Sequence, residues 1–484
     1  MTALDSLLDP LPWLIVLPLA WATLAFVLGP GRGARLAIAC LGVQLALALL
    51  LAAQLLTEGP RTHAVGGWGA PLGIDLLADG LSVLMLLLTQ AVAWPLALYA
   101  RAYFRLPGQG AAAAWFWPLS GFLLAGMNSL LLSADLFNIY VTLELLSLAA
   151  VALVAAGGGA ARLQAALRYL LVSLAASGCY LLGVALLYGV YGSVDIASLT
   201  PLLRAHVPLA AWAAAALMLL ALLAKTALLP FHFWLPAAHA SAAAPVSALL
   251  SALVVKAGFY LVLRLALGVF APLAEVAALA LGLLGAAAVL WGGWQALRAP
   301  ELKLLVAYST VAQLGYLFLI FPLLAADGVA VQAGVLQALA HGLAKAAMFA
   351  AAGVLLLATG QPLVAGLRGT AQTQPLTLFA FALAGLTLCG LPPSGGFLAK
   401  WLLIDAALTQ GQWGWVPLLL GASLLTAAYV YRVLRPAFQL APQPIRRHAV
   451  PRSLEWVAFG LAAASVLLGF FGVALGRLLS LGLA

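Results

Sequence analysis

The chain has 484 residues, of which 65% are hydrophobic and only 7% are charged. This composition excludes a soluble globular protein and predicts an all-α polytopic membrane protein. The formal net charge of +9 does not indicate nucleic-acid binding, because the arginines are scattered through short loops and form no basic stripe.

Apolar runs of about 20 residues, ended by glycine, proline or charged residues, predict about fourteen membrane-spanning helices. Nothing basic precedes the first run and no convincing small-residue cleavage site follows it, so we expect a span there and no cleavable signal peptide. In chain order the predicted spans lie near residues 11–29, 34–57, 75–99, 113–133, 136–156, 165–190, 208–235, 245–268, 272–297, 302–323, 328–358, 374–409, 413–438 and 453–478.

Two of these spans are interrupted, the seventh at Pro230 and Pro236 and the twelfth at LPPSGG, residues 391–396. They lie five spans apart, which forces opposite orientations and predicts two inverted five-helix repeats around a transport site. A broken helix also requires a hydrated, protein-lined cavity for its freed backbone groups. The expected divisions are residues 1–110 for helices one to three, 111–270 for the first repeat, 271–440 for the second, and 441–484 for the last helix.

Lysines and arginines outside the interiors of the apolar runs, at span ends or in loops, are distributed unevenly between alternate loops. Loops after odd-numbered spans hold Arg32, Arg35, Arg101, Arg105, Arg162, Arg168, Arg298, Lys303, Arg368, Arg432, Arg435, Arg446, Arg447 and Arg452. Loops after even-numbered spans and the C-terminal segment hold only Arg61, Arg204, Arg264 and Arg477. Positive charge favours the cytoplasmic side, so we expect a multi-pass protein of the inner (plasma) membrane with both termini on the external side.

Lysines are buried where a membrane protein should exclude them. Within apolar runs lie Lys225, Lys256, Lys345 and Lys400, whereas Lys303 is near a segment end. A charged side chain at mid-helix costs roughly 2.5–3.5 kcal/mol. Glu144 is the one carboxylate well inside a span. It could form a simple ion pair with one lysine, but it cannot pair with all of them. At least two lysines should therefore be neutral part of the time, which predicts a row of groups that pass protons.

Histidines accompany the lysines. His341 and Lys345 are four residues apart and face one side of the eleventh span, with Gln337 one turn earlier. His341 could be an ordinary core residue, but its neighbours favour a place in the proton row. His232 and His239 flank the break in the seventh span. They are candidates for gating protons or for an interfacial aromatic belt, and both interpretations stay open.

Further polar groups lie in the tenth and twelfth spans. Tyr308, Ser309, Thr310 and Gln313 could hydrogen-bond between helices, bind water in a proton path, or do both. Lys400 follows PPSGGF, so we expect it near the start of a new half-helix, where an unpaired ammonium is disfavoured.

No motif predicts a catalytic, cofactor or metal site in this chain. Glycine-rich nucleotide loops, paired-histidine haem patterns and cysteine clusters are all missing from the sequence. The cysteines Cys40, Cys179 and Cys389 lie singly in apolar segments and are expected to be free thiols. No second histidine or cysteine stands at zinc-ligand spacing from His341.

Six motifs together resemble the antiporter-like subunits shared by respiratory complex I, membrane-bound hydrogenases and Mrp-type cation/proton antiporters. They are ADGLS (78–82), ADLFNIYVTLELL (134–146), AKTALLPFHFWLPAAHASAAAPVSALLSALVVKAG (224–258), YSTVAQLGY (308–316), HGLAK (341–345) and LPPSGGFLAK (391–400). The chain is most similar to the D subunit of Mrp antiporters, through its length, LRYLLVSLAASG (167–178), LYGVYGSVDIASL (187–199) and lysine at position 400.

The resemblance implies fourteen helices with inverted repeats and broken seventh and twelfth helices. It implies that Glu144 and Lys225 are a coupling pair, Lys256 a central relay, His341 and Lys345 a bridge, and Lys400 the terminal group. It also implies partner membrane subunits and exchange of protons with a monovalent cation such as Na⁺.

Two alternatives stay open within this resemblance. The chain could be the proton-pumping membrane subunit of an NADH:quinone oxidoreductase or hydrogenase complex, with the redox chemistry in other subunits. It could also couple proton flow to inorganic-carbon uptake. A purely structural membrane module is disfavoured by the cost of the buried charges.

Overall fold

A computed structural model describes residues 9–325, 328–440 and 448–482 of the chain. Arg446 and Arg447, which contribute to the predicted charge asymmetry, lie outside the described residues. The helices are α2 (Pro10–Glu58), α3 (Gly80–Tyr103), α4 (Gly110–Leu132), α5 (Leu136–Ala155), α6 (Ala160–Tyr191), α7 (Ile196–Ala205), α8 (Leu209–Thr226), α9 (Leu235–Ser241), α10 (Ala244–Leu249), α11 (Val255–Leu267), α12 (Ala271–Arg298), α13 (Leu302–Phe318), α14 (Val329–Thr359), α15 (Thr370–Thr373), α16 (Pro375–Cys389), α17 (Gly395–Thr409), α18 (Trp415–Phe438), α19 (Arg452–Leu467) and α20 (Gly472–Leu479).

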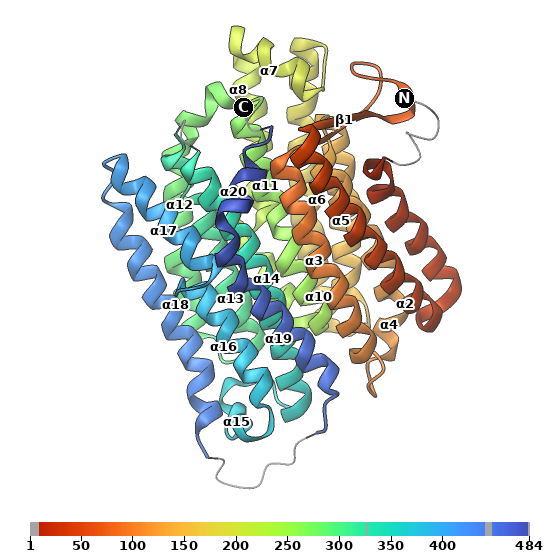
Figure 1. The fold of residues 1–484 in the computed structure, drawn as a ribbon, viewed down its shortest axis with the longest axis vertical. Helices are drawn as coiled ribbons and strands as arrows, with labels where there is room; N and C mark the ends of the chain where they lie inside the picture. Colours follow the sequence, from red (N-terminus) through yellow and green to blue (C-terminus); the bar gives the residue numbers. More distant parts are fainter. Residues whose placement is uncertain (1–8, 326–327, 441–447, 483–484) are drawn as a thin grey trace.

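These helices form one bundle with most of its long axes roughly parallel (Figure 1). Among the described residues, twelve helical segments are long and apolar enough to cross a membrane. The predicted all-α membrane class is therefore confirmed. A two-stranded antiparallel sheet, β1 (Arg61–Ala64) with β2 (Asp75–Ala78), is a small addition outside the bundle helices.

The difference between twelve segments and the predicted fourteen spans has two local causes. The first two predicted spans lie in α2, a 49-residue element whose backbone leaves helical geometry at Gly29, with φ 73° and ψ 173°. Glycine adopts this conformation without steric cost. The run at 374–409 is divided into α16 and α17, each of 15 residues, on either side of the LPPSGG interruption.

The helices differ in how deeply they lie in the bundle. The most apolar window of the segment Ala244–Leu267 is 100% buried and that of α14 is 89% buried, whereas those of α12 and α18 are each 33% buried. The outer face of α12 exposes Val276, Leu279 and Leu283. Such apolar exposure suits contact with lipid, while α11 and α14 carry Lys256, His341 and Lys345 in the interior.

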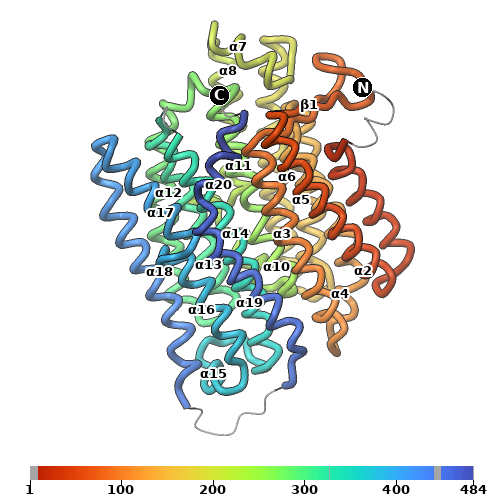
Figure 2. Tube along the Cα trace, in the orientation of Figure 1, coloured from red at the N-terminus to blue at the C-terminus, as the bar shows by residue number. Residues whose placement is uncertain are grey.

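Elements adjoining the two chain ends gather at one end of the bundle. In Figures 1 and 2, β1, α7 and α20 lie at the top, and α15 lies at the opposite end. The short helices α7 and α15, which lie between long helices of the bundle, are thus at opposite ends.

Close helix packing between α12 and α13 depends on glycine. A Cβ placed on Gly315 would lie 2.4 Å from the Gly285 carbonyl oxygen, and one on Gly292 would lie 2.5 Å from the Ala312 nitrogen. Small residues of this kind let membrane helices approach closely.

Gly315→Ala is therefore expected to lower the free energy of unfolding by about 1–3 kcal/mol, the usual cost of overpacking. Thermal unfolding of the purified protein in detergent measures this as a lower midpoint. Gly421→Ala in α18 is the matched control, because its Cβ would meet nothing within 4 Å. Equal midpoints for the two variants would contradict the packing argument.

Candidate functional site

Glu144 and Lys225 meet at the break of the seventh predicted span. Lys225 lies in the last turn of α8, which ends at Thr226 with Ala227 in left-handed geometry. Its Nζ is 3.4 Å from Glu144 Oε1. It also donates to Ser147 Oγ at 2.9 Å and to Ser173 Oγ at 3.0 Å. The carboxylate thus has a single lysine partner, and three oxygen atoms hold the ammonium.

Lys256 follows an irregular stretch of helix. Residues 250–254 between α10 and α11 form a π-helical turn, a feature that often marks functional sites. Lys256 is 0% exposed, and its Nζ donates to the Ser251 carbonyl oxygen. The Ser251 hydroxyl in turn lies 3.0 Å from Thr310 Oγ1 on α13. Lys256 therefore lies beside the tenth predicted span, but it bonds the Ser251 carbonyl and not the hydroxyl that meets Thr310.

The same stretch of α13 also contacts Lys345, which lies on α14. Its Nζ donates to the Val306 carbonyl oxygen at 3.1 Å and to the Ser309 hydroxyl. Thr310 Oγ1 donates to that same Val306 oxygen at 3.0 Å. Thr310 and Lys345 therefore share one carbonyl oxygen, whereas the hydrogen-bond chain from Lys256 is interrupted at Ser251, between its carbonyl and its hydroxyl.

His341 lies one turn before Lys345 on α14 and is 0% exposed. Neither of its ring nitrogens has a hydrogen-bond partner among the described protein groups. One turn earlier again, the Gln337 amide donates to Gln313 Oε1 at 3.0 Å. His341 therefore lies between the Lys345–Ser309 contact and the Gln337–Gln313 contact and takes part in neither. A buried polar ring without protein partners is costly.

Lys400 ends the row. Its Nζ donates to the Leu388 and Cys389 carbonyl oxygens at 2.8 and 3.2 Å and to Ser423 Oγ at 3.1 Å. It also lies 4.2 Å from the centre of the Tyr316 ring, and Gln313 Nε2 shares the Leu388 oxygen at 3.3 Å.

Lys400 lies near the start of the half-helix α17, as expected, and no described ion pair includes it, but its ammonium is hydrogen-bonded. The residue is the sixth of α17, and its partners are the last carbonyls of α16. These carbonyls form the negative end of a helix dipole, which favours a cation.

The geometry agrees with a family match. Residues 133–426 match the family described as NADH:quinone oxidoreductase/Mrp antiporter, TM. The chain belongs to this family. The match contains every predicted relay residue from Glu144 to Lys400, and the family resemblance drawn from the sequence motifs is confirmed.

Known proteins of two kinds are similar to this family member. The N subunit of NADH-quinone oxidoreductase from Desulforudis audaxviator is 37% identical over 433 residues, covering 87% of this chain and 84% of that protein. The D subunit of the Na(+)/H(+) antiporter from Bacillus subtilis is 28% identical over 425 residues, covering 87% and 85%. A chain in the structure of the Mrp complex from Dietzia sp. superimposes with a TM-score of 0.91 at 28% identity, covering 100% of this chain and 97% of that one.

The two histidines beside the break of this antiporter-family chain differ. His239 is 1% exposed, its ring packs 5.1 Å from that of Phe349, and its nitrogens have no partner among the described protein groups. His232 accepts from Trp291 Nε1 at 3.1 Å, and Trp291 is exposed. His239 therefore lies in the interior, while His232 is half-buried, with one ring nitrogen bonded to Trp291 and the other without a partner among the described protein groups.

Lys303 lies near a helix start, as expected, yet it is buried. Its Nζ donates to the Ala240 and Ala242 carbonyl oxygens, and Arg162 Nε donates to the Ser241 oxygen at 3.0 Å. Two cations thus cap the C-terminal end of the short helix α9 and hold the broken segment in place.

Several contacting groups are not evident from the sequence. Hydroxyls at Ser147, Ser173, Ser251 and Ser423 bind the lysines directly or extend their network, and Ser177 donates to Glu144. Ser147 lies three residues after Glu144, and Ser173 and Ser177 are four apart, so helical spacing is the signal that could have found them. In contrast, no described hydrogen bond joins the half-buried Tyr308 to the row.

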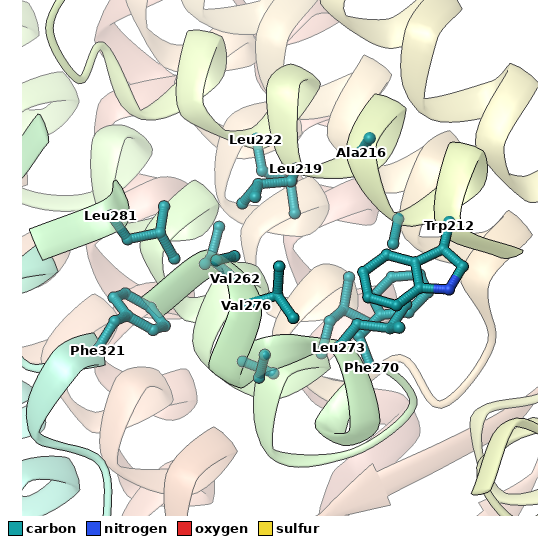
Figure 3. A pocket seen from close by; sticks show the side chains of 15 residues that line it. Trp212, Ala216, Leu219, Leu222, Val262, Phe270, Leu273, Val276, Leu281 and Phe321 are labelled. Carbon is teal, nitrogen blue, oxygen red and sulfur yellow. The ribbon is translucent and has the colours of Figure 1, made fainter. Parts of the chain in front are cut away.

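An apolar pocket lies outside the row, between α8, α11 and α12 (Figure 3). Its lining includes Trp212, Leu222, Val262 and Phe270. It offers no charged group to a proton or cation. Among the described residues there is also no group of three or more histidine, cysteine or acidic side chains that could hold a metal ion.

Proposed function

We propose that this chain is the proton-translocating subunit of a multisubunit Mrp-type monovalent cation (Na⁺)/proton antiporter. The observation that carries the proposal is a row of buried lysines held by hydroxyls and backbone carbonyls, with a single carboxylate at one end. The similarity to the D subunit of the Bacillus subtilis antiporter and to a chain of the Dietzia Mrp complex supports this assignment.

In this proposal protons move along Glu144, Lys225, Lys256, Lys345, His341 and Lys400. An ionised Glu144 beside Lys225 stabilises the ammonium. When the carboxylate is neutralised or moves away, burial favours release of a proton from the lysine. The three oxygen contacts of Lys225 keep the amine in place in either state.

Water completes the row where protein groups do not. No described hydrogen bond joins Lys225 to Lys256, and none reaches His341. Buried polar groups without protein partners are usually satisfied by ordered water. We therefore propose a hydrated thread through these two gaps, with Gln337 and Gln313 passing the connection from His341 to Lys400. His239 is a candidate gate for protons on the side of α9.

The two interrupted regions fit the proposed inverted repeats, residues 111–270 and 271–440, with residues 1–110 and 441–484 outside them. Lys225 precedes the break after α8, and Lys400 follows the break after α16. Lys400 contacts a carbonyl oxygen at its break, whereas Lys225 contacts hydroxyls of α5 and α6, so the two lysines occupy different positions in the proposed repeats. The chain would lie in the inner (plasma) membrane with both termini external.

This orientation predicts opposite labelling of the two bundle ends. Arg204→Cys in α7 and Gln372→Cys in α15 place a thiol at exposed positions. In intact cells, a membrane-impermeant maleimide should label the first variant at once and the second only after permeabilisation. The unmodified chain, with its three cysteines in helices, is the control for background labelling. The reverse pattern would overturn the assigned orientation.

A second candidate is favoured by the 37% identity with the N subunit of NADH-quinone oxidoreductase. Here the same row would be driven by a redox arm in other subunits. Purification in gentle detergent distinguishes the two, because co-purifying flavin or iron–sulfur subunits indicate electron-driven pumping. Membrane subunits alone, with Na⁺-dependent proton movement in proteoliposomes, support the antiporter. A chain that purifies alone would contradict both.

A further inference from the structure

One face of α11 carries Lys256, Tyr260 and Arg264 at four-residue intervals. This helix runs from the bundle interior towards the end where α7 and α20 lie (Figure 1). At 1.5 Å per residue, Arg264 lies about 12 Å beyond Lys256 along the helix axis. A row of three polar side chains therefore leads from the proposed relay to the external end. Only Lys256 belongs to the relay, so Tyr260 and Arg264 need another explanation.

Arg264 is bound by a carboxylate that is distant in sequence. It contacts Asp79 through both ends of its guanidinium, Nη1 with Oδ2 and Nη2 with Oδ1, the second at 2.8 Å. Asp79 is 1% exposed and also accepts the Ser82 backbone N–H at the start of α3. The pair thus joins α3 to α11 in a bidentate, partly buried geometry.

The Tyr260 hydroxyl joins Arg264 to the backbone of α4, and each of its hydrogen bonds has a defined donor and acceptor. Its hydroxyl accepts from Arg264 Nη2 at 2.9 Å and donates to the Leu131 carbonyl oxygen at 2.7 Å. Arginine has donors only and no acceptor. A proton leaving Lys256 towards the outside would meet a hydroxyl whose hydrogen is already committed and then a cation that cannot accept it. Lys256 instead donates to Ser251, in the preceding turn.

The C-terminal segment covers this network. The Gly80 N–H donates to the Leu481 carbonyl oxygen at 2.7 Å. A Cβ on Gly80 would lie only 2.0 Å from the Leu478 carbonyl oxygen. Backbone therefore packs directly against the residue that follows Asp79, while the Arg264 side chain stays 14% exposed.

We propose that Asp79, Arg264 and Tyr260 form an external seal that closes the relay above Lys256. They are positioning residues, and the proposal rests on the proposed role of Lys256. The fixed charge of Arg264 opposes a proton in the same way that arginine excludes protons from other membrane pores. Protons at Lys256 then pass sideways to Lys345, instead of leaking outward.

Passive proton flux tests the seal. Proteoliposomes containing the intact complex are given a pH gradient with valinomycin and K⁺, without a gradient of the exchanged cation. Arg264→Gln should raise passive flux about tenfold, the factor for one unit charge at roughly 12 Å and an effective dielectric constant of about 20. Arg264→Lys keeps the charge and should stay tight. Adding Lys256→Met to Arg264→Gln should remove the leak, because the leaking proton no longer has a group to bind at position 256.

Folding and coupling are controlled separately. If Arg264→Gln fails to assemble, Asp79→Asn keeps the shape and leaves the Arg264 charge uncompensated, so it should lower passive flux, the opposite direction. An assembled variant whose flux equals that of the unmodified complex overturns the seal and leaves a purely structural ion pair. A leak that persists without Lys256 also overturns it. Failure of the relay itself would show differently, as cation-driven exchange that survives the loss of Lys225.

Discussion

Replacement of Lys225 by alanine is expected to abolish cation-driven proton exchange while the protein still inserts into the membrane. The ammonium holds Glu144 and two serine hydroxyls at the break after α8. Without the Lys225 ammonium, neutralisation of Glu144 releases no proton into the row. The expected loss is on the order of 10²-fold or more, as for removal of a positioned proton-transfer group. Exchange rates in proteoliposomes, normalised to inserted protein, provide the measurement.

Lys225→Arg separates proton release from fixed charge. Arginine keeps a cation beside Glu144 but does not give up its proton, so this variant should be as inactive as Lys225→Ala. Ser147→Ala is the matched control, because Lys225 retains Ser173 and Glu144, and exchange should fall by no more than severalfold. Wild-type exchange by Lys225→Ala would refute the relay.

The sequence predicts which side chains are out of place in a membrane, because burial cost depends only on residue type and position in an apolar run. Glu144 and the buried lysines stand out for this reason. The interruptions beside Lys225 and Lys400 are equally visible, since proline and glycine break helices through local geometry. The inverted repeats and the number of spans stay predictions.

What meets in space is less predictable. The sequence alone assigns Arg264 to an external loop, but the residue lies in α11 and pairs with Asp79, 185 residues away. Nothing in either local sequence indicates that contact, because it arises only when α3 packs near α11. The carbonyl partners of Lys400 are likewise set by the turn between α16 and α17. Backbone acceptors have no signature in side-chain identity.

His341→Leu is expected to stop exchange without weakening the fold. The ring is fully buried and its nitrogens have no partner among the described protein groups. An unsatisfied buried polar atom costs about 1–3 kcal/mol, so an apolar side chain should leave the thermal midpoint unchanged or raised. Exchange should nevertheless fall on the order of 10²-fold, because the step between Lys345 and Gln337 loses its proton acceptor.

Two further variants test whether exchange is lost because the His341 ring no longer takes up and releases a proton. His341→Gln keeps a polar group that can bind water but cannot take up a proton at neutral pH, so it should also be inactive. His232→Leu alters a histidine bonded to Trp291 at the bundle surface and should retain exchange. If His341→Leu exchanges normally, Lys345 passes protons without the imidazole. If His341→Gln alone is active, a water-binding side chain suffices and the ring has no proton-carrying role.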